Sequence, residues 1–325
     1  MRPAVDHAVA LTRRAVRLLL EGPGGAGRPD DGWLAVAVSG GADSLALAAA
    51  AEHVGHRLGL RLRGLIVDHG LQPGSGLVAQ DAAKQLHGLG FDDVQVLPVT
   101  VDGPGGPEAA ARRARYRALR ETGHPLILLG HTRDDQAETV LLGLGRGSGP
   151  RSIAGMRVVD PPWGRPFLDV PREITVRACA AQNLVPWTDP HNADPRFTRV
   201  RLRAEVLPLL EDVLQQGVAG ALARTARQLQ EDAEALDTLA AELLEQVRDD
   251  GDLIVESLTP VPKALRRRVL RLWLRQAGVR ELTDAQLRSV DALIGEWRGQ
   301  GGVWLPGGLE ASRAHGRLRV GTCQS

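Results

Sequence analysis

A short polar stretch, Val38–Ser44 (VSGGADS), follows the apolar run Trp33–Ala37 and combines two glycines, two hydroxyl side chains and one carboxylate. Glycines let the backbone come close to an oxyanion, and amides at the start of a following helix point toward it. The stretch therefore favours a phosphate-binding loop. Asp43 would repel a bare phosphate, so its presence indicates a bridging Mg²⁺. A simpler alternative stays open at this point, because Asp43 or Ser44 could serve only to cap a helix.

Two common phosphate-binding loops are excluded by the sequence. A Walker A loop needs a lysine directly after a glycine, but the two lysines of the chain, Lys84 and Lys263, follow an alanine and a proline. The GxGxxG pattern of dinucleotide-binding folds is also absent after the first apolar run. The loop therefore belongs to neither class.

A second segment, Glu108–Tyr116 (EAAARRARY), carries arginines at helical spacing. Arg112 and Arg115 fall on one face of a predicted helix, and Glu108 lies one turn before Arg112. Taken alone, the segment is better explained by a solvated basic face with internal ion pairs.

The third segment, His131–Glu138 (HTRDDQAE), places three carboxylates at the start of a predicted helix. Asp135 and Glu138 fall about 60° apart on the side away from the apolar stripe, and Asp134 lies at the edge of that stripe. Carboxylates at a helix N-terminus stabilise the helix dipole, so a structural role is an alternative. So many carboxylates near a phosphate crevice also suit Mg²⁺ or an ammonium group.

Alternating strand and helix patterns position these segments. Strands are expected over Leu34–Val38, Leu62–Val67, Val94–Val99 and Leu126–Leu129, with helices over residues 4–21, 44–58, 76–88, 107–122 and 134–144. This alternation predicts an α/β fold with a parallel sheet covered on both faces. Ligands of such sheets bind beyond the carboxyl ends of the strands. The loops VSGGADS, VDHG and GHTRDD are therefore expected to meet in one crevice.

The second half of the chain has a different pattern. Residues 145–205 are expected to be irregular, whereas residues 218–247 form one helix with a single apolar stripe. A small module follows, with helices over residues 263–276 and 284–297 and a hairpin over residues 302–320. The predicted domains are a catalytic domain over residues 1–215, a connector helix over residues 216–248 and a small, mainly α-helical substrate-binding domain over residues 249–325.

The composition narrows the class of function. A formal net charge of +1 gives no global field for a polyanion, so a nucleic-acid surface has to be a local patch. Cys179 and Cys323 form no CxxC pair, which argues against zinc ribbons and iron–sulfur clusters. The first 21 residues predict an amphipathic helix rather than a signal peptide, and no apolar run is long enough for a membrane span. A cytoplasmic location is expected.

Together the motifs resemble those of the tRNA(Ile)-lysidine synthetases, a branch of the N-type (PP-loop) ATP pyrophosphatases. The segments SGGADS, VDHGLQPGS, EAAARRARY, GHTRDDQAET and RGSG occur in that family's order and spacing, and RPFL, Trp187–Asn192 and Phe197–Arg203 continue the match. The chain departs from the family pattern at Ser152, Ile153, His191 and Val200, which bears on tRNA contacts rather than on the ATP site. The extra C-terminal domain of many members is expected to be missing.

The resemblance implies a Rossmann-like PP-loop ATPase domain and a ligase that forms a carbon–nitrogen bond. In such an enzyme the O2 atom of the wobble cytosine of tRNA(Ile), in the anticodon CAU, attacks the α-phosphate of ATP and displaces pyrophosphate. The ε-amine of L-lysine then attacks C2, and AMP leaves. The product, lysidine, changes the specificity of the tRNA from methionine to isoleucine.

The resemblance also assigns roles to residues. The implied ATP-binding residues are Ser39, Gly40, Gly41, Ala42, Asp43, Ser44, Val67, His69 and Arg115. The implied catalytic residues are Asp43, Arg112, His131 and Asp135, with His131 as a proton acceptor or a structural residue. Asp135 and Glu138 are expected to bind lysine, and Asp43 and Asp134 to bind Mg²⁺. The expected tRNA-binding residues are Arg146, Arg201, Arg203, Arg267 and Arg271. A homodimer is a further expectation.

Three other functions are the alternatives. A tRNA thiolation enzyme adenylates a base in the same way but needs a sulfur-carrying cysteine or cluster, and Cys179 and Cys323 lack a paired setting. Amide-forming relatives usually carry an ammonia source, which the sequence does not show. A non-catalytic ATP- or tRNA-binding module is disfavoured by the intact set of carboxylates.

Overall fold

The computed structural model describes residues 5–23, 25–70, 74–103, 106–147, 149–189 and 194–322. The chain divides into two compact units, residues 1–229 and residues 230–325. The long helix α10 (Val218–Val247) crosses the boundary between them. None of the helices in the described ranges combines the length and the apolar character needed to cross a membrane.

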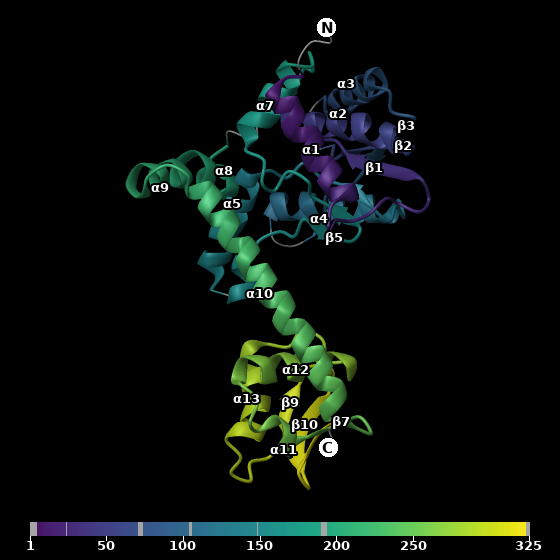
Figure 1. The fold of residues 1–325 in the computed structure, drawn as a ribbon. Coiled ribbons are helices and arrows are strands. Elements are labelled where there is room, and N and C mark those ends of the chain that lie inside the picture. The colour runs from purple at the N-terminus through teal and green to yellow at the C-terminus, as the bar shows by residue number, and fades with distance from the viewer. Residues whose placement is uncertain are drawn as a thin grey trace. The chain divides into compact units, whose positions relative to one another are not determined.

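The first unit is built on a six-stranded sheet (Figure 1). Its strands are β1 (Trp33–Ala37), β2 (Arg61–Asp68), β3 (Asp93–Pro98), β4 (Ile127–Leu128), β5 (Val159–Asp160) and β6 (Trp163–Gly164). They lie in the order β3-β2-β1-β4-β6-β5, and all neighbours pair in parallel except β5, which runs antiparallel to β6 at the edge. The predicted parallel sheet is confirmed, with β1 and β4 as neighbours at its centre.

Helices cover both faces of this sheet, as its alternating side chains require (Figure 1). In β1, Leu34 and Val36 pack into a core shared by helices on one face, whereas Ala35 packs into a smaller core on the other. The first face carries α1 (His7–Glu21), α2 (Ala42–Arg57), α3 (Ser75–Leu89) and α7 (Arg172–Ala180). The second face carries α4 (Gly106–Glu121), through Leu119 and Tyr116.

The expectation that residues 145–205 are irregular is wrong, because β5, β6, a nine-residue helix and several shorter helices lie within them, and two of these elements pack into the first unit. Strand β6 completes the sheet beside β4, and α7 packs against α1 and α2. The α7 helix is held by the buried side chains of Ile174, Thr175, Ala178 and Cys179, which recur at helical spacing. The segment is short and follows a proline, so its periodicity covers little more than two turns.

Helix α5 (Arg133–Arg146) follows β4 and carries the acidic segment. Shorter helices follow it: α6 (Pro150–Ile153), α8 (Thr198–Arg201), a π-helical turn (Leu202–Val206) and α9 (Leu207–Leu214). A capping box starts α5, because the Asp135 carboxylate accepts the Thr132 N–H. Asp135 therefore stabilises the N-terminus of the helix that carries it.

The second unit combines three helices with a five-stranded antiparallel sheet. The helices are α11 (Val255–Leu258), α12 (Lys263–Gln276) and α13 (Asp284–Gly295). The strands are β7 (Arg248–Asp249), β8 (Asp252–Ile254), β9 (Val303–Leu305), β10 (Leu309–Ala314) and β11 (Arg317–Thr322), in the order β7-β8-β11-β10-β9. Both predicted helices and the predicted hairpin are present. The end of α10 belongs to this core, since Ala240, Leu244 and Val247 are buried in it. The domain boundaries at residues 215 and 248 stay a prediction.

Candidate functional site

The loop between β1 and α2 has the geometry of an anion cradle. Gly40 has a φ of +82°, a conformation that side chains other than glycine rarely adopt. Its carbonyl accepts a hydrogen bond from the Trp187 N–H at 2.9 Å, which fixes the turn. Gly41 is the N-cap residue of α2 and offers no side chain to cap the first amides of the helix. These amides are therefore available to an anionic ligand.

The two serines of the loop brace it from within. The Ser39 N–H donates to the Ser44 hydroxyl at 3.1 Å, and that hydroxyl donates to the Gly41 carbonyl at 2.9 Å. Ser44 is buried, whereas Ser39 is exposed. Ser44 therefore holds the loop in shape, and the Ser39 hydroxyl, 3.2 Å from the Ser44 hydroxyl, belongs to the exposed one of the two serines.

The loop after β4 lies directly against this cradle. A Cβ atom on Gly130 would come within 3.0 Å of the backbone carbonyl of Asp43. This close approach accounts for glycine at the position and places the acidic start of α5 beside the start of α2. The predicted meeting of VSGGADS and GHTRDD at one end of the sheet is confirmed, whereas the meeting of VDHG with them stays a prediction.

One turn of α7 connects the carboxylates of the two loops. The Arg172 guanidinium lies 2.8 Å from Asp135 and 3.3 Å from Asp43. The backbone N–H of Arg172 donates to the Asp134 carboxylate at 2.9 Å, so this carboxylate caps the N-terminus of α7. The Thr175 hydroxyl donates to Asp43 and lies on the same face of the helix as Arg172. Three carboxylates from two loops are thus held by two residues of one helix.

Asp135 and Glu138 differ in the hydrogen-bonding capacity that they have left. One oxygen of Asp135 accepts the N–H and the hydroxyl of Thr132, and the other pairs with Arg172. Glu138 has no exposed side-chain surface, and its Oε1 atom lies 2.7 Å from the Arg203 guanidinium. Its Oε2 atom is buried with no hydrogen-bond partner among the described residues, although Arg199 lies 3.6 Å away. The Oε2 atom of Glu138 thus accepts no hydrogen bond among the described residues, and its ion-pair partner there is Arg199.

Burial and neighbouring charges divide these acids by their pKa values. Burial raises the pKa of Asp43, against the opposing effect of the Arg172 guanidinium. Burial likewise raises the pKa of Glu138, against the opposing effect of Arg203. Burial also disfavours the ionised form of Asp135, but Arg172 and the other donors outweigh it, and the pKa is lowered. Of the three acids, Asp135 is thus the one that burial and its neighbours keep most firmly ionised.

The inner face of α4 contributes two arginines without acidic partners. Arg112 donates a hydrogen bond to the Tyr116 hydroxyl at 3.1 Å and lies over its ring. The Arg115 Nε atom is buried without a hydrogen-bond partner. Burial lowers the pKa of both guanidiniums, and in the described ranges neither forms an ion pair with a carboxylate. Two half-buried cations without ion pairs in the described ranges suit an anionic ligand such as a phosphate.

Two histidines complete this side of the site. Burial lowers the pKa of His131 to about 3, and it also lowers the pKa of His69, with Arg115 adding to the effect. Both imidazoles are therefore neutral at neutral pH, and the Nδ1 atom of each is buried without a partner in the described part of the chain. Val67 lies at the end of β2, two residues before His69, and packs against the smaller core.

The residues predicted to bind tRNA are dispersed. Arg203 forms an ion pair with Glu138 in the acidic cluster. Arg201 forms an ion pair with Glu205 on the surface. Arg146 ends α5 and is exposed. Arg267 and Arg271 lie on α12 in the other unit, where Arg267 pairs with Asp291. Their contacts with tRNA stay a prediction.

Three residues of the cluster had no role assigned from the sequence: Arg172, Thr175 and Arg199. Arg172 and Thr175 stand three residues apart after Pro171, and this spacing is the available signal. Their partners lie up to 132 residues away along the chain, so no local pattern reveals them.

The donor set fits Mg²⁺ only with help from a ligand. In the parts of the chain that the structure describes, no three histidine, cysteine or acidic side chains gather in a metal-binding group. Mg²⁺ commonly takes one or two carboxylates together with phosphate oxygens and water. Asp43 lies at the cradle, but its Oδ1 atom accepts from Thr175 and its Oδ2 atom pairs with Arg172. One oxygen of Asp134 is also engaged by α7, so either carboxylate would hold Mg²⁺ through its remaining lone pairs.

Comparisons with known proteins agree along most of the chain. Residues 13–210 match the PP-loop domain family, and residues 253–319 match the TilS substrate binding domain family. The tRNA(Ile)-lysidine synthase of Rhodococcus erythropolis is 57% identical over 88% of this chain and 89% of its own. The enzyme of the same name from Rhodococcus jostii is 53% identical over 97% of this chain and 96% of its own.

A solved structure supports the fold alone. The U34-tRNA thiolase NcsA from Methanococcus maripaludis, solved with its [4Fe-4S] cluster, superposes with a TM-score of 0.54 at 18% identity. The match covers 69% of this chain and 80% of the thiolase.

Proposed function

The chain belongs to the tRNA(Ile)-lysidine synthase family, ATP-dependent ligases that form a carbon–nitrogen bond, and we propose how its residues divide that reaction. The cradle and α4 act on ATP, and the start of α5 acts on lysine. The observation that carries the second assignment is the buried Oε2 atom of Glu138, which accepts no hydrogen bond among the described residues and has Arg199 3.6 Å away.

The first half of the reaction releases pyrophosphate. The free amides at the start of α2 and the Ser39 hydroxyl bind the phosphate oxygens of ATP. Arg112 and Arg115 face the charge that develops when the cytosine O2 attacks the α-phosphate, and the lack of carboxylate partners leaves their charge available. Asp43 would hold Mg²⁺ together with the phosphates, and the metal would supply further charge neutralisation.

The second half of the reaction needs a bound and deprotonated lysine amine. The Oε2 atom of Glu138 accepts no hydrogen bond and has only the longer ion pair with Arg199, so it can accept from the ammonium group, whereas both oxygens of Asp135 already accept hydrogen bonds. We therefore assign the direct contact to Glu138 and the positioning of the acidic cluster to Asp135. A base works best when its pKa approaches the working pH. The raised pKa of Glu138 suits proton acceptance better than the pKa of about 3 of His131.

The thiolation alternative receives no support from Cys179. Its thiol is buried, donates to the Ala42 carbonyl at 3.3 Å, and has its pKa raised to about 11 by burial. Such a thiol is a poor nucleophile at neutral pH. Cys323 lies outside the described residues. The homodimer and the cytoplasmic location stay predictions.

The function is tested with a tRNA(Ile) transcript of anticodon CAU, ATP and radiolabelled lysine. We expect label to enter the tRNA with one AMP and one pyrophosphate released per lysine incorporated. Release of AMP that ignores lysine and instead supports incorporation from a sulfur donor would overturn the assignment.

The lysine site is tested by a matched pair of amide variants. Glu138→Gln should raise the KM for lysine about tenfold to a hundredfold, because a charge-assisted contact is lost. It should leave the KM for ATP near the wild-type value. Asp135→Asn should impair both substrates, because Asp135 shares Arg172 with Asp43. The assignment fails if Glu138→Gln keeps a normal KM for lysine.

A further inference from the structure

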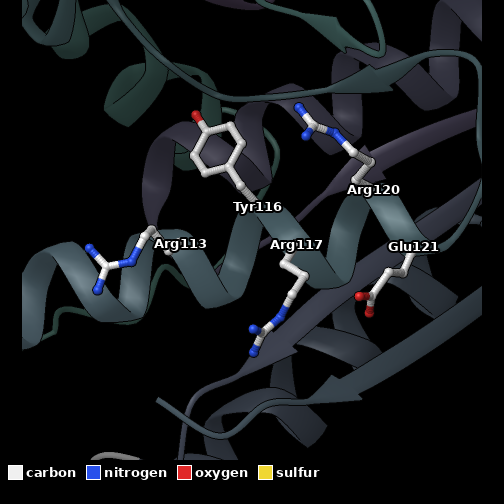
Figure 2. Close-up of a pocket in the computed structure, with 5 residues that line it drawn as sticks. All are labelled: Arg113, Tyr116, Arg117, Arg120 and Glu121. Atoms are coloured by element: carbon white, nitrogen blue, oxygen red, sulfur yellow. The ribbon is translucent and has the colours of Figure 1, made fainter. Parts of the chain in front are cut away.

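The outer face of α4 carries a shallow hollow that the reaction described above does not use. Its volume is about 360 Å³, and its lining comes entirely from α4: Arg113, Tyr116, Arg117, Arg120 and Glu121. Figure 2 shows these side chains projecting from successive turns of the helix. Three cations and one carboxylate therefore border one hollow on the surface.

Two of these cations have no counter-ion. Arg117 and Arg120 are exposed, and within the described ranges neither forms an ion pair. Other exposed arginines of the chain, such as Arg201, Arg288 and Arg319, do pair with nearby carboxylates. The spacing of three and four residues repeats along one helix face, which puts successive charges roughly one helical turn, about 5 Å, apart.

Aromatic rings lie beneath the cations and connect the hollow to the site. Tyr116 meets the buried Trp163 edge to face, with ring centroids 4.8 Å apart. The Arg120 guanidinium lies 5.8 Å from the Trp163 ring, which limits the positions it can take. The Tyr116 hydroxyl accepts the hydrogen bond from Arg112 on the inner face. One tyrosine thus separates the outer hollow from an arginine of the proposed ATP site.

We propose that this outer face of α4 binds the ribose–phosphate backbone of the tRNA strand next to the nucleotide that enters the site. The inference rests on the proposed function, because a base reaches Arg112 only if its strand passes close to α4. Consecutive phosphates carry one negative charge each, and Arg117 and Arg120, which form no ion pair in the described ranges, are complementary to them. The face contacts backbone rather than bases, so it contributes affinity and register, not sequence selection.

The salt dependence of tRNA binding tests this inference. The double variant Arg117→Ala/Arg120→Ala is compared with Arg14→Ala/Arg17→Ala, which removes two exposed arginines from α1. Alanine favours the helical state, so both variants should fold, and thermal melting checks this. Arg113 is kept because it already has an interaction partner. The dissociation constant for the tRNA(Ile) transcript is measured by filter binding over a range of salt concentrations.

Loss of two phosphate contacts should lower the slope of log affinity against log salt by about 1.4 to 1.8. The KM values for ATP and lysine should remain unchanged, and the α1 control should keep the wild-type slope. An unchanged slope in the α4 variant overturns the inference, as does an equal loss in the control. If the wild-type enzyme binds the transcript but incorporates no lysine, the proposed function fails instead, and the binding data are judged separately.

Discussion

Helices α4 and α12 are both arginine-rich, yet their arginines meet different surroundings. On α12, Arg266 and Arg267 both pair with Asp291, and Arg268 pairs with Asp237 on α10. On α4, Arg112 and Arg115 face the site and Arg117 and Arg120 face the outer hollow, and none of the four has an ion-pair partner in the described ranges. Arginines of α12 thus form ion pairs within the fold, whereas these four arginines of α4 can bind an anionic ligand.

The difference teaches that an arginine count does not identify a nucleic-acid surface. The carboxylates that neutralise α12 come from α10 and α13, which are 31 and 24 or 25 residues away in sequence. The side of the sheet that α4 covers provides apolar and aromatic side chains instead. What faces the helix, rather than what it contains, decides whether its charge is available to a ligand.

The largest expected effect comes from removing the carboxylate that α12 depends on. Asp291→Ala leaves Arg266 buried, with a side chain only 4% exposed and without its counter-ion. The free energy of unfolding should fall by about 3–5 kcal/mol, as measured by urea denaturation. Asp284→Ala is the control, since it removes the partner of exposed Arg288 and should have little effect. If both variants lowered the free energy of unfolding equally, the structural role assigned to the ion pairs of α12 with Asp291 would be wrong.

A smaller effect is expected at the inner face of α4. Arg112→Ala should lower kcat about a hundredfold, or about 2.7 kcal/mol, because a preorganised cation is lost from the transition state. The melting temperature should change little, since Arg112 holds no carboxylate in place. Arg14→Ala, on the exposed side of α1, should keep full activity. A variant that loses stability rather than turnover would show that Arg112 resembles the arginines of α12.

Lowering the pH should weaken lysine binding at Glu138, which pairs with Arg203, but should not affect ATP binding through Arg112 and Arg115. The raised pKa of Glu138 means that this carboxylate takes up a proton earlier than usual as the pH falls. Below that pKa the KM for lysine should rise about tenfold per pH unit. Arg112 and Arg115 of α4 form no ion pair with a carboxylate in the described ranges, so they add no acid-side titration to ATP binding. His131 stays neutral over this range.

Steady-state kinetics between pH 5 and pH 8, on the wild type and on Glu138→Gln, measure this effect. The variant should show a KM for lysine that is already high and no longer depends on pH in the acidic range. A wild-type KM for lysine that stays constant down to pH 5 would contradict the role of Glu138.

The smallest effect is expected for the surface charge of α12. Arg267→Ala should change the salt slope of tRNA binding by less than the 0.7–0.9 expected for one phosphate contact, because Asp291 already engages this guanidinium. The same filter-binding series as for the α4 variant measures it. A drop as large as a full phosphate contact would restore the expectation from sequence that Arg267 binds tRNA.

The sequence predicted the frame of the catalytic unit well. Strands such as Leu34–Val38 and helices such as residues 44–58 show strong periodicity, and the observed β1 and α2 differ from them by one or two residues. The meeting of VSGGADS with GHTRDD followed from the rule for parallel sheets. Family motifs then identified which of several phosphate chemistries the loop serves.

The interior of the site could not be predicted in the same way. Arg172 and Thr175 act through partners on other elements, and α7 itself is only nine residues long. Arg203 was expected at the tRNA and lies against Glu138. Whether a charged side chain meets solvent or a distant carboxylate depends on tertiary packing, which local spacing does not encode.

The turn of α7 that joins Asp43 to Asp135 has a thermodynamic consequence. Arg172 forms ion pairs with both carboxylates. A ligand that alters the Arg172–Asp43 contact therefore also alters the Arg172–Asp135 contact. If the proposed sites are right, we expect binding of ATP and binding of lysine to be linked equilibria, and linkage is reciprocal. Whatever factor ATP imposes on the dissociation constant of lysine, lysine must impose on that of ATP, and Arg172→Lys should shrink both factors together.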